Sequence, residues 1–291
     1  MKPPAFEYHA PSTLREALRL LADLQDQASV LAGGQSLVPM LNLRHARPAH
    51  VVDINGIPRL DQLTNRNGRL TLGALVRQRQ AERSDLVRTH CPLLAEALPL
   101  IGHPQIRSRG TVAGSLAHAD PRAELPLVMV LLEPTLVLRR LGGQRVLEPA
   151  EFFVGRLKTA CRPDELLTEV RLPRWPAGAG WAYQAVSRRQ GDLALVAAAA
   201  VVQRAADSTI ADARLGFAGV ADIPLRARAT EEALRGARPS AELLATMARQ
   251  AAAALQPADD VLASGSYRQY AAGVLAERAL RTALQRTGGS V

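Results

Sequence analysis

The chain has 291 residues, of which 47% are apolar and 22% charged, so it can bury a sizeable core and two domains are expected. A net charge of +9 would fit a nucleic-acid-binding protein, but only two of the 36 basic residues are lysines, and the arginines are scattered. Aromatic residues make up 3% of the chain, too few for a platform that stacks bases. Nucleic-acid binding is therefore disfavoured, and acidic partners or an anionic ligand explain the charge more simply.

The two cysteines, Cys91 and Cys161, lie far apart and form no C-x-x-C pair. Zinc sites and iron–sulfur clusters use several thiolates, so neither is expected on this chain, and neither is a disulfide framework. The first residues include no apolar signal segment, and the longest apolar run is about half the length of a membrane-spanning helix. These features predict a cytoplasmic protein without membrane insertion.

The first 55 residues predict a small α/β unit. A strand is expected over residues 6–9, and an amphipathic helix over 13–25, with Thr13 as N-cap and Glu16 completing a capping box. Strands are expected over residues 29–31 and 50–54. A glycine turn at 32–36 follows the first of these, and a turn between strand and helix presents backbone N–H groups to an anion.

The next segment, to about residue 176, predicts mixed structure. Hairpins are expected around Asn67-Gly68 and Gly142-Gly143, and a buried helix is expected over 125–132. Short helices are expected over 77–85 and 92–100, and strands over 106–109 and 166–172. The strand over 106–109 would lead into a second turn of small residues, 110–115.

Prolines and glycines between residues 173 and 180 predict a boundary that divides the chain into residues 1–176 and 177–291. Three antiparallel strands are expected beyond it, over 181–188, 193–204 and 208–220. Helices are expected over 229–236, 240–256 and 267–285.

Two small-residue turns in one domain suggest a ligand with a phosphate-bearing spine, because such turns let the backbone approach anionic oxygens. Glu124 follows the second turn, where its carboxylate could accept hydrogen bonds from ligand hydroxyls. Neither turn matches G-x-G-x-x-G or the P-loop, and no nucleophile motif is present. His118 and Asp120 receive no chemical role. Arg188 fits both a solvated strand end and a group that neutralises ligand charge.

Four segments resemble the FAD-binding (medium) subunits of the molybdenum hydroxylases, a family that includes carbon monoxide, xanthine and nicotine dehydrogenases. The A-G-G-Q-S sequence of residues 32–36 is similar to the family's first glycine motif. The sequence I-R-S-R-G-T-V-A-G-S of residues 106–115, continuing to Glu124, is similar to its second. Residues 165–170 and 187–192 match two further segments, so the resemblance spans nearly the whole chain.

The resemblance implies an α+β fold. The FAD-binding part would have the fold of vanillyl-alcohol oxidase and p-cresol methylhydroxylase, with two α/β subdomains over about 1–55 and 56–176. A C-terminal three-stranded antiparallel sheet with helices would follow over 177–291. FAD would be bound by this chain, while molybdopterin would lie on a large partner subunit and [2Fe-2S] clusters on a small one. A dimer of heterotrimers is one assembly that the resemblance allows.

The implied function is electron transfer from the partner's clusters through FAD to an external acceptor, within an oxidoreductase complex. The alternative is a self-contained flavoprotein oxidase or dehydrogenase of the same fold that acts on a small molecule. No catalytic side chain and no metal ligand is expected on this chain. The residues expected at the FAD are Leu31, Ala32, Gly33, Gly34, Gln35, Ser36, Leu37, Ile101, Thr111, Val112, Ala113, Gly114, Ser115, Glu124, Leu167, Gln184 and Arg188.

Roles follow the same resemblance. Residues 32–36 and 111–115 would surround the pyrophosphate, Ile101 and Leu167 would lie near the isoalloxazine, and Gln184 or Arg188 would replace a basic residue of the family. Two positions depart from the family pattern. Ala113 replaces a glycine, which is tolerable if its φ is negative, and Leu193 stands where some members have an aromatic that shields the flavin.

Overall fold

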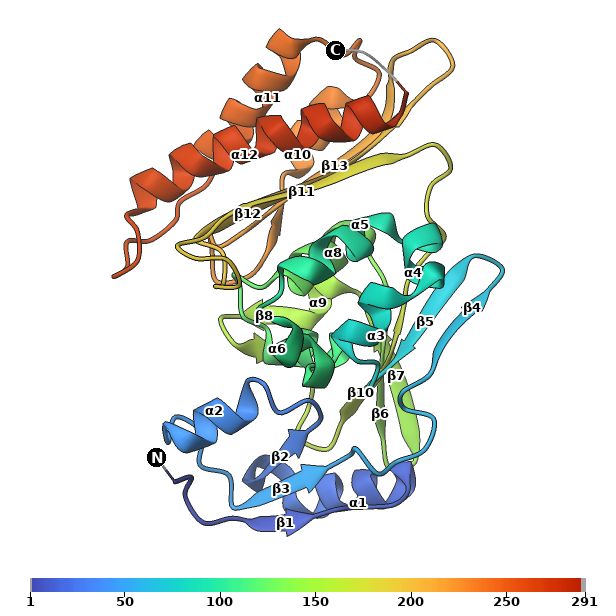
Figure 1. Cartoon of the computed structure of the whole chain (residues 1–291), viewed down its shortest axis with the longest axis vertical. Helices are drawn as coiled ribbons and strands as arrows, with labels where there is room; N and C mark the ends of the chain where they lie inside the picture. The colour runs from blue at the N-terminus through green and yellow to red at the C-terminus, as the bar shows by residue number, and fades with distance from the viewer. Residues whose placement is uncertain (1, 289–291) are drawn as a thin grey trace.

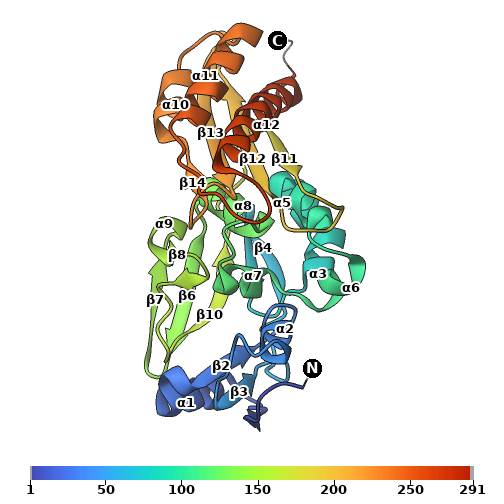
Figure 2. The same cartoon turned by 90° about the vertical axis from the view of Figure 1, so that its left-hand side faces the viewer.

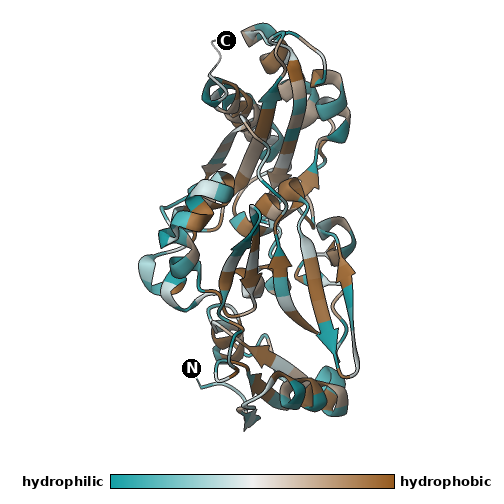
Figure 3. Cartoon of the chain, turned by 90° about the vertical axis from the view of Figure 1, so that its right-hand side faces the viewer, coloured by the Kyte–Doolittle hydropathy of each residue, from teal (hydrophilic) through white to brown (hydrophobic). Residues whose placement is uncertain are grey.

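The structure is a computed structural model that describes residues 2–288. Of the four sheets among residues 2–288, the three larger ones follow one another along the long axis of a mixed α/β molecule, from the N-terminal sheet at one end to the C-terminal sheet at the other (Figure 1). Apolar stretches lie along the strands of these sheets (Figure 3). Within residues 2–288, no helix combines the length and apolarity that crossing a membrane requires.

The N-terminal sheet is parallel, with strand order β1-β3-β2. Helix α1 buries Ala17, Leu18 and Leu21 at the predicted helical spacing. Thr13 caps it, since its Oγ1 accepts a hydrogen bond from the Glu16 N–H at 3.2 Å. The Glu16 carboxylate accepts from the N–H of Ser12 rather than of Thr13, at 2.9 Å. The elements of this unit are β1 (Glu7–His9), α1 (Leu14–Leu24), η1 (Gln25–Gln27), β2 (Ala28–Leu31), α2 (Leu37–Asn42) and β3 (His50–Asp53).

The middle sheet is antiparallel, with strand order β4-β5-β10-β6-β7, and both predicted hairpins are present in it. Helix α8 lies between this sheet and the C-terminal one (Figure 2) and is buried on all sides except at Val130. Its strands are β4 (Leu63–Arg66), β5 (Arg69–Gly73), β6 (Thr135–Arg140), β7 (Gly143–Leu147) and β10 (Leu166–Arg171). A separate two-stranded sheet is formed by β8 (Phe153–Gly155) and β9 (Lys158–Thr159). The helices are α3 (Gln78–Arg83), α4 (Asp85–His90), α5 (Pro92–Ala97), η2 (Leu98–Leu100), α6 (Pro104–Arg109), α7 (Val112–His118), α8 (Glu124–Leu132) and α9 (Pro149–Phe152).

The strand expected over 106–109 is wrong, because these residues end helix α6. Pro104 occupies the first turn, where its fixed φ suits a helix and its missing N–H costs nothing. Arg107 is buried because its guanidinium pairs with Glu82, with Nε 2.8 Å from Oε2. The residues after Gly110 are likewise not an open turn, since helix α7 begins at Val112 with Thr111 as its N-cap.

The C-terminal sheet has four strands rather than the expected three, in the order β11-β12-β13-β14. One of its faces packs on the helices that follow it, and the other packs on the core beneath, which includes α5 and α8 (Figure 1). Its strands and helices are β11 (Gly180–Val186), β12 (Val196–Arg204), β13 (Ile210–Ala218), β14 (Leu225–Arg226), α10 (Arg228–Leu234), α11 (Ala241–Ala253) and α12 (Gly265–Arg286).

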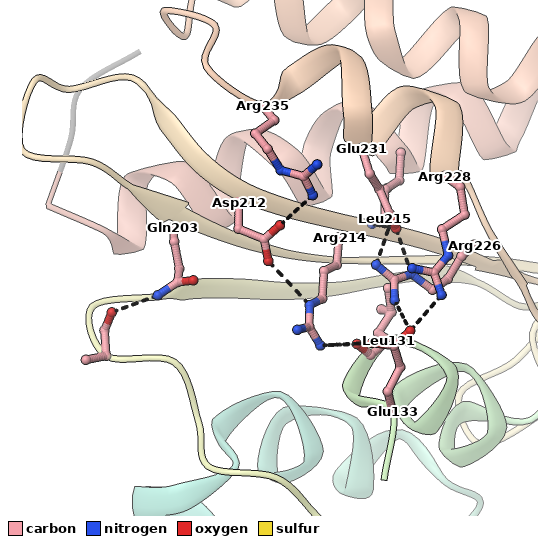
Figure 4. A network of polar contacts seen from close by, with 11 residues as sticks. Leu131, Glu133, Gln203, Asp212, Arg214, Leu215, Arg226, Arg228, Glu231 and Arg235 are labelled. Atoms are coloured by element: carbon pink, nitrogen blue, oxygen red, sulfur yellow. Dashed lines mark hydrogen bonds and ion pairs between the residues drawn. The ribbon is translucent and has the colours of Figure 1, made fainter. Parts of the chain in front are cut away.

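A polar network fastens the end of α8 to this sheet (Figure 4). Glu133, which follows α8, accepts hydrogen bonds from Arg226 and Arg228, each at 2.6 Å. Arg226 also pairs with the buried Glu231 at 2.6 Å, and Arg214 donates to the carbonyl of Leu131 at 2.8 Å. The helix that begins at Glu124 is therefore held at its far end by the C-terminal sheet.

Candidate cofactor site

The two predicted loops lie against each other at Gly33. A Cβ atom on Gly33 would lie 2.5 Å from the carbonyl oxygen of Arg109 and 2.7 Å from the Cα of Gly110. Only glycine allows this approach, because a methyl group would overlap the facing backbone. We refer to residues 31–37 and 109–115 together as the paired loops.

The first of the paired loops has backbone donors to offer. Gly34 adopts a positive φ of 73°, which turns the chain from β2 into α2. Within residues 2–288, the N–H groups of residues 33–37 donate to no protein acceptor, whereas the Val38 N–H bonds to the Gly34 carbonyl at 3.0 Å. A run of unpaired N–H groups at such a turn can bind anionic oxygens.

The second loop is shaped by the cap of α7. The Thr111 Oγ1 accepts a hydrogen bond from the Gly114 N–H at 3.0 Å. A Cβ on Gly114 would lie 2.5 Å from that oxygen, so the cap requires glycine here. Ala113 is buried and is not among the residues with positive φ, which meets the condition under which the methyl group was expected to be tolerated.

Two side chains that the sequence did not single out hold the paired loops in place. The Asn55 side-chain amide donates to the Ala32 carbonyl at 2.8 Å. Arg77 donates to the Arg109 carbonyl at 2.5 Å and to Asn55 Oδ1 at 2.6 Å. One chain of hydrogen bonds thus connects both loops, although Asn55 follows β3 of the N-terminal sheet and Arg77 follows β5 of the middle sheet. No local sequence signal could have identified a contact between residues so far apart.

The paired loops carry positive charge. Burial and the repulsion of the neighbouring Arg109 charge lower the pKa of Arg77, and the charges of Asp53 and Asp61 offset this only in part. A bound anion would relieve this repulsion. The electrostatics therefore suit phosphate groups at the loops.

Glu124 begins α8 and is only 6% exposed. Burial, with a smaller contribution from the Asp120 charge, raises the pKa of Glu124 to about 7. Tyr183 on β11 faces the same region: burial raises the pKa of its hydroxyl well above the ordinary value, and the Glu124 charge raises it further. The Tyr183 hydroxyl has no hydrogen-bond partner among the described residues. A buried orphan hydroxyl beside a buried carboxyl fits a polar ligand or water at this place.

The remaining predicted residues lie in the middle and C-terminal parts of the chain. The residues that follow Ile101 face the loop that contains Arg188 and Leu193, since a Cβ on Gly191 would lie 2.7 Å from the ring of His103 and 3.0 Å from the Gly102 carbonyl. Leu167 is buried in β10, and Arg188 is exposed. Gln184 shares a strand face with Ala182 and Val186, which pack toward the C-terminal helices. The structure therefore does not bring Gln184 to the paired loops, whereas Tyr183, which the sequence did not single out, packs in the core that contains the buried residues of α8.

Comparison with known proteins places this geometry in a family. Residues 4–175 match the family model described as the FAD-binding domain in molybdopterin dehydrogenase. Residues 181–283 match the CO dehydrogenase flavoprotein C-terminal domain. The protein is therefore a flavoprotein component of an oxidoreductase.

Individual relatives agree along the whole length. The chain is 39% identical to subunit alpha of the 6-hydroxypseudooxynicotine dehydrogenase complex of Paenarthrobacter nicotinovorans, over 98% of this chain and 97% of that protein. It is 37% identical to the carbon monoxide dehydrogenase medium chain of Hydrogenophaga pseudoflava, over 98% and 99%. A solved structure of carbon monoxide dehydrogenase from Hydrogenophaga pseudoflava superimposes with a TM-score of 0.95 at 39% identity, covering 98% of this chain and 99% of that one. The chain belongs to the FAD-binding medium subunits of the molybdenum hydroxylases, as its motifs predicted.

Proposed function

We propose that this chain binds FAD at the paired loops and passes electrons from the [2Fe-2S] clusters of a partner subunit through the flavin to an external acceptor. The observation that carries the proposal is the contact of Gly33 with Arg109 and Gly110, which brings the two loops together into one site. The flavin would supply the redox chemistry, and the protein would bind it, orient it and tune its electronics.

The roles of the residues follow from their surroundings. The free N–H groups of residues 33–37 would bind the pyrophosphate. In the second loop the N–H groups of Val112, Gly114 and Ser115 already bond within the protein, so this loop would shape the site by its close backbone contact. The Glu124 carboxyl would accept hydrogen bonds from ligand hydroxyls, which would offset the cost of its burial. Ile101 and the loop around Arg188 and Leu193 would lie at the isoalloxazine end, where the two parts of the chain meet. Leu167 would pack on the same side. Gln184 lies on the face of β11 that packs toward the C-terminal helices, and this position does not support a contact with FAD.

The division of the chain at about residue 176 is part of the proposal, as is a fold of the vanillyl-alcohol oxidase and p-cresol methylhydroxylase type. The last strand of the middle sheet ends at Arg171 and the C-terminal sheet begins at Gly180. The two matched family models also separate between residues 175 and 181. Both observations support a boundary there.

Partner subunits are proposed for the other cofactors. Burial raises the pKa of both Cys91 and Cys161 to about 12, so neither thiol is poised to ligate a cluster as thiolate. A small subunit would carry the [2Fe-2S] clusters, and a large one the molybdopterin.

Anaerobic mixing tests the proposed electron path. The FAD-loaded chain is mixed with the dithionite-reduced small subunit, and the flavin absorbance is followed by stopped flow. We expect the flavin to be bleached while the cluster is reoxidised. The path is overturned if the reduced cluster leaves the flavin oxidised, or if the substrate of the complex reduces the flavin of the isolated chain with no partner present. The second result would identify a self-contained oxidase.

A further inference from the structure

Three side chains of the metal-binding type converge at the free edge of the N-terminal sheet. Glu7 and His9 lie two residues apart on β1 and therefore on one face of the strand. His50 is the first residue of β3 and pairs directly with Glu7 in the parallel register. One ligand atom from each residue lies within 4.8 Å of the other two.

The separations of these atoms match those around a tetrahedral metal ion. His9 Nε2 lies 3.1 Å from His50 Nδ1, and the Glu7 Oε2 lies 3.3 Å from His50 Nδ1 and 3.9 Å from His9 Nε2. Ligands about 2.0–2.1 Å from a zinc ion at tetrahedral angles are about 3.3 Å apart. The three atoms thus surround a point at which such an ion would fit, and a fourth position would stay open to water.

Hydrogen bonds among these three side chains do not satisfy this arrangement. The proton on a neutral imidazole can sit on only one of its two nitrogens. If His50 Nδ1 carries its proton, that proton can be donated to Glu7 or to His9, and the other acceptor is left without a donor. If His50 Nδ1 is bare, it can accept from His9, but it then faces the Glu7 carboxylate without a proton between them. A cation resolves the conflict, because all three atoms can act as lone-pair donors to it.

We propose that Glu7, His9 and His50 form a binding site for Zn²⁺ or a similar divalent transition metal. Two imidazoles and a carboxylate suit this class of ion better than Mg²⁺ or Ca²⁺, which prefer all-oxygen ligands. The site is open to solvent, since the Glu7 side chain is 73% exposed and that of His50 17%, so the metal exchanges with chelators.

The metal would tie an edge strand to the sheet. Strand β1 has only three residues and pairs with β3 alone. Strand β3 leads directly to Asn55, which holds the first of the paired loops through the Ala32 carbonyl. Metal binding would therefore stabilise the strand beneath that loop. The sequence did not predict this site, because His50 is 41 residues from His9 and the three residues form no local motif.

The test uses the full-length, tag-free, FAD-loaded chain after treatment with EDTA. Zn²⁺ is titrated in competition with a chromophoric chelator, and Co²⁺ absorption reports the coordination geometry. We expect one Zn²⁺ per chain, and an affinity at least about tenfold weaker in His9→Ala and in His50→Ala. At known sites, replacing a residue that only hydrogen-bonds a metal ligand already weakens metal affinity by about 10–100-fold. The control is His45→Ala, which replaces an exposed histidine outside the cluster. Zn²⁺ should also raise the Tm of the wild type and of the control, but not of the two cluster variants.

Absence of saturable Zn²⁺ binding overturns the proposal, and so does wild-type affinity in His9→Ala. If His50→Ala loses its circular dichroism spectrum, Glu7→Ala decides instead, because that side chain is largely exposed and its removal leaves the fold intact. Unchanged affinity in Glu7→Ala would then exclude a three-ligand site.

Discussion

Without a bound ligand, the buried carboxyl of Glu124 lowers the stability of the folded chain when it is ionised. Its carboxyl lies at the start of a buried helix, near Asp120 and the orphan Tyr183 hydroxyl. Ionisation there is opposed by burial, and no cationic side chain forms an ion pair with it among residues 2–288. The residue fits a site that is completed by hydroxyl donors from a cofactor.

The stability of the FAD-free chain should therefore fall as pH rises. The native pKa of Glu124 is raised from 4.5 to about 7, so the folded state binds a proton that the unfolded state has released between these values. The stabilising contribution is present below about pH 4.5 and is lost as pH rises through 7. Replacing the residue in Glu124→Gln removes this dependence.

Urea unfolding at pH 5 and pH 8 measures the effect. From pH 5 to pH 8, the stability of the wild type relative to Glu124→Gln should fall by about 2–3 kcal/mol. Because both proteins share every other titrating group, only the difference between them is used. If the free energy of unfolding changed equally with pH in both proteins, the pKa of the Glu124 carboxyl would not be raised in the folded state.

At the scale of elements, helix α8 connects Glu124 to the C-terminal sheet. Glu124 begins the helix, and Glu133 ends it within the network of Arg214, Arg226 and Arg228 (Figure 4). Burial acts to raise the pKa of Glu133, but the charges of Arg226 and Arg228 outweigh it, so the pKa lies below its usual value. The helix cannot shift without breaking these ion pairs.

Glu133→Gln should destabilise the folded chain by about 1–2 kcal/mol, since the Arg226 side chain is only 8% exposed and loses one of its two carboxylate partners. The control, Glu277→Gln, removes an exposed i,i+4 pair with Arg281 within α12 and should cost less than about 0.5 kcal/mol. Equal losses in denaturant unfolding would mean that the network at Glu133 is only a surface pair.

At the scale of the whole molecule, local sequence signals predicted local structure. The Thr13 cap gave the start of α1, and Gly142-Gly143 gave the β6–β7 hairpin. The strand expected at 106–109 is wrong because Pro104 begins a helix there, and because the partner of Arg107, Glu82, lies 25 residues away in sequence. Strand β14 has two residues, too few to leave a pattern.

The candidate site was predicted in the same uneven way. The glycine motifs identified the paired loops, because close backbone approach requires specific residues at specific positions. The roles of Asn55 and Arg77 were not predicted, because a side chain that donates to a carbonyl far away in sequence leaves no local motif. The strand face of Gln184 and Tyr183 depends on register, which the sequence of β11 alone does not determine.

FAD titration of the flavin-free chain, followed by fluorescence, tests the central claim most directly. The wild type should bind one FAD per chain. Gly33→Ala would place a methyl group 2.5 Å from the Arg109 carbonyl, which should weaken binding by at least about fivefold because overpacking of this kind costs about 1–3 kcal/mol. Gly143→Ala, whose Cβ would meet only the Arg140 guanidinium at 3.8 Å, should bind as the wild type does. No FAD uptake by the wild type, or equal affinity in the two variants, would contradict an FAD site at the paired loops.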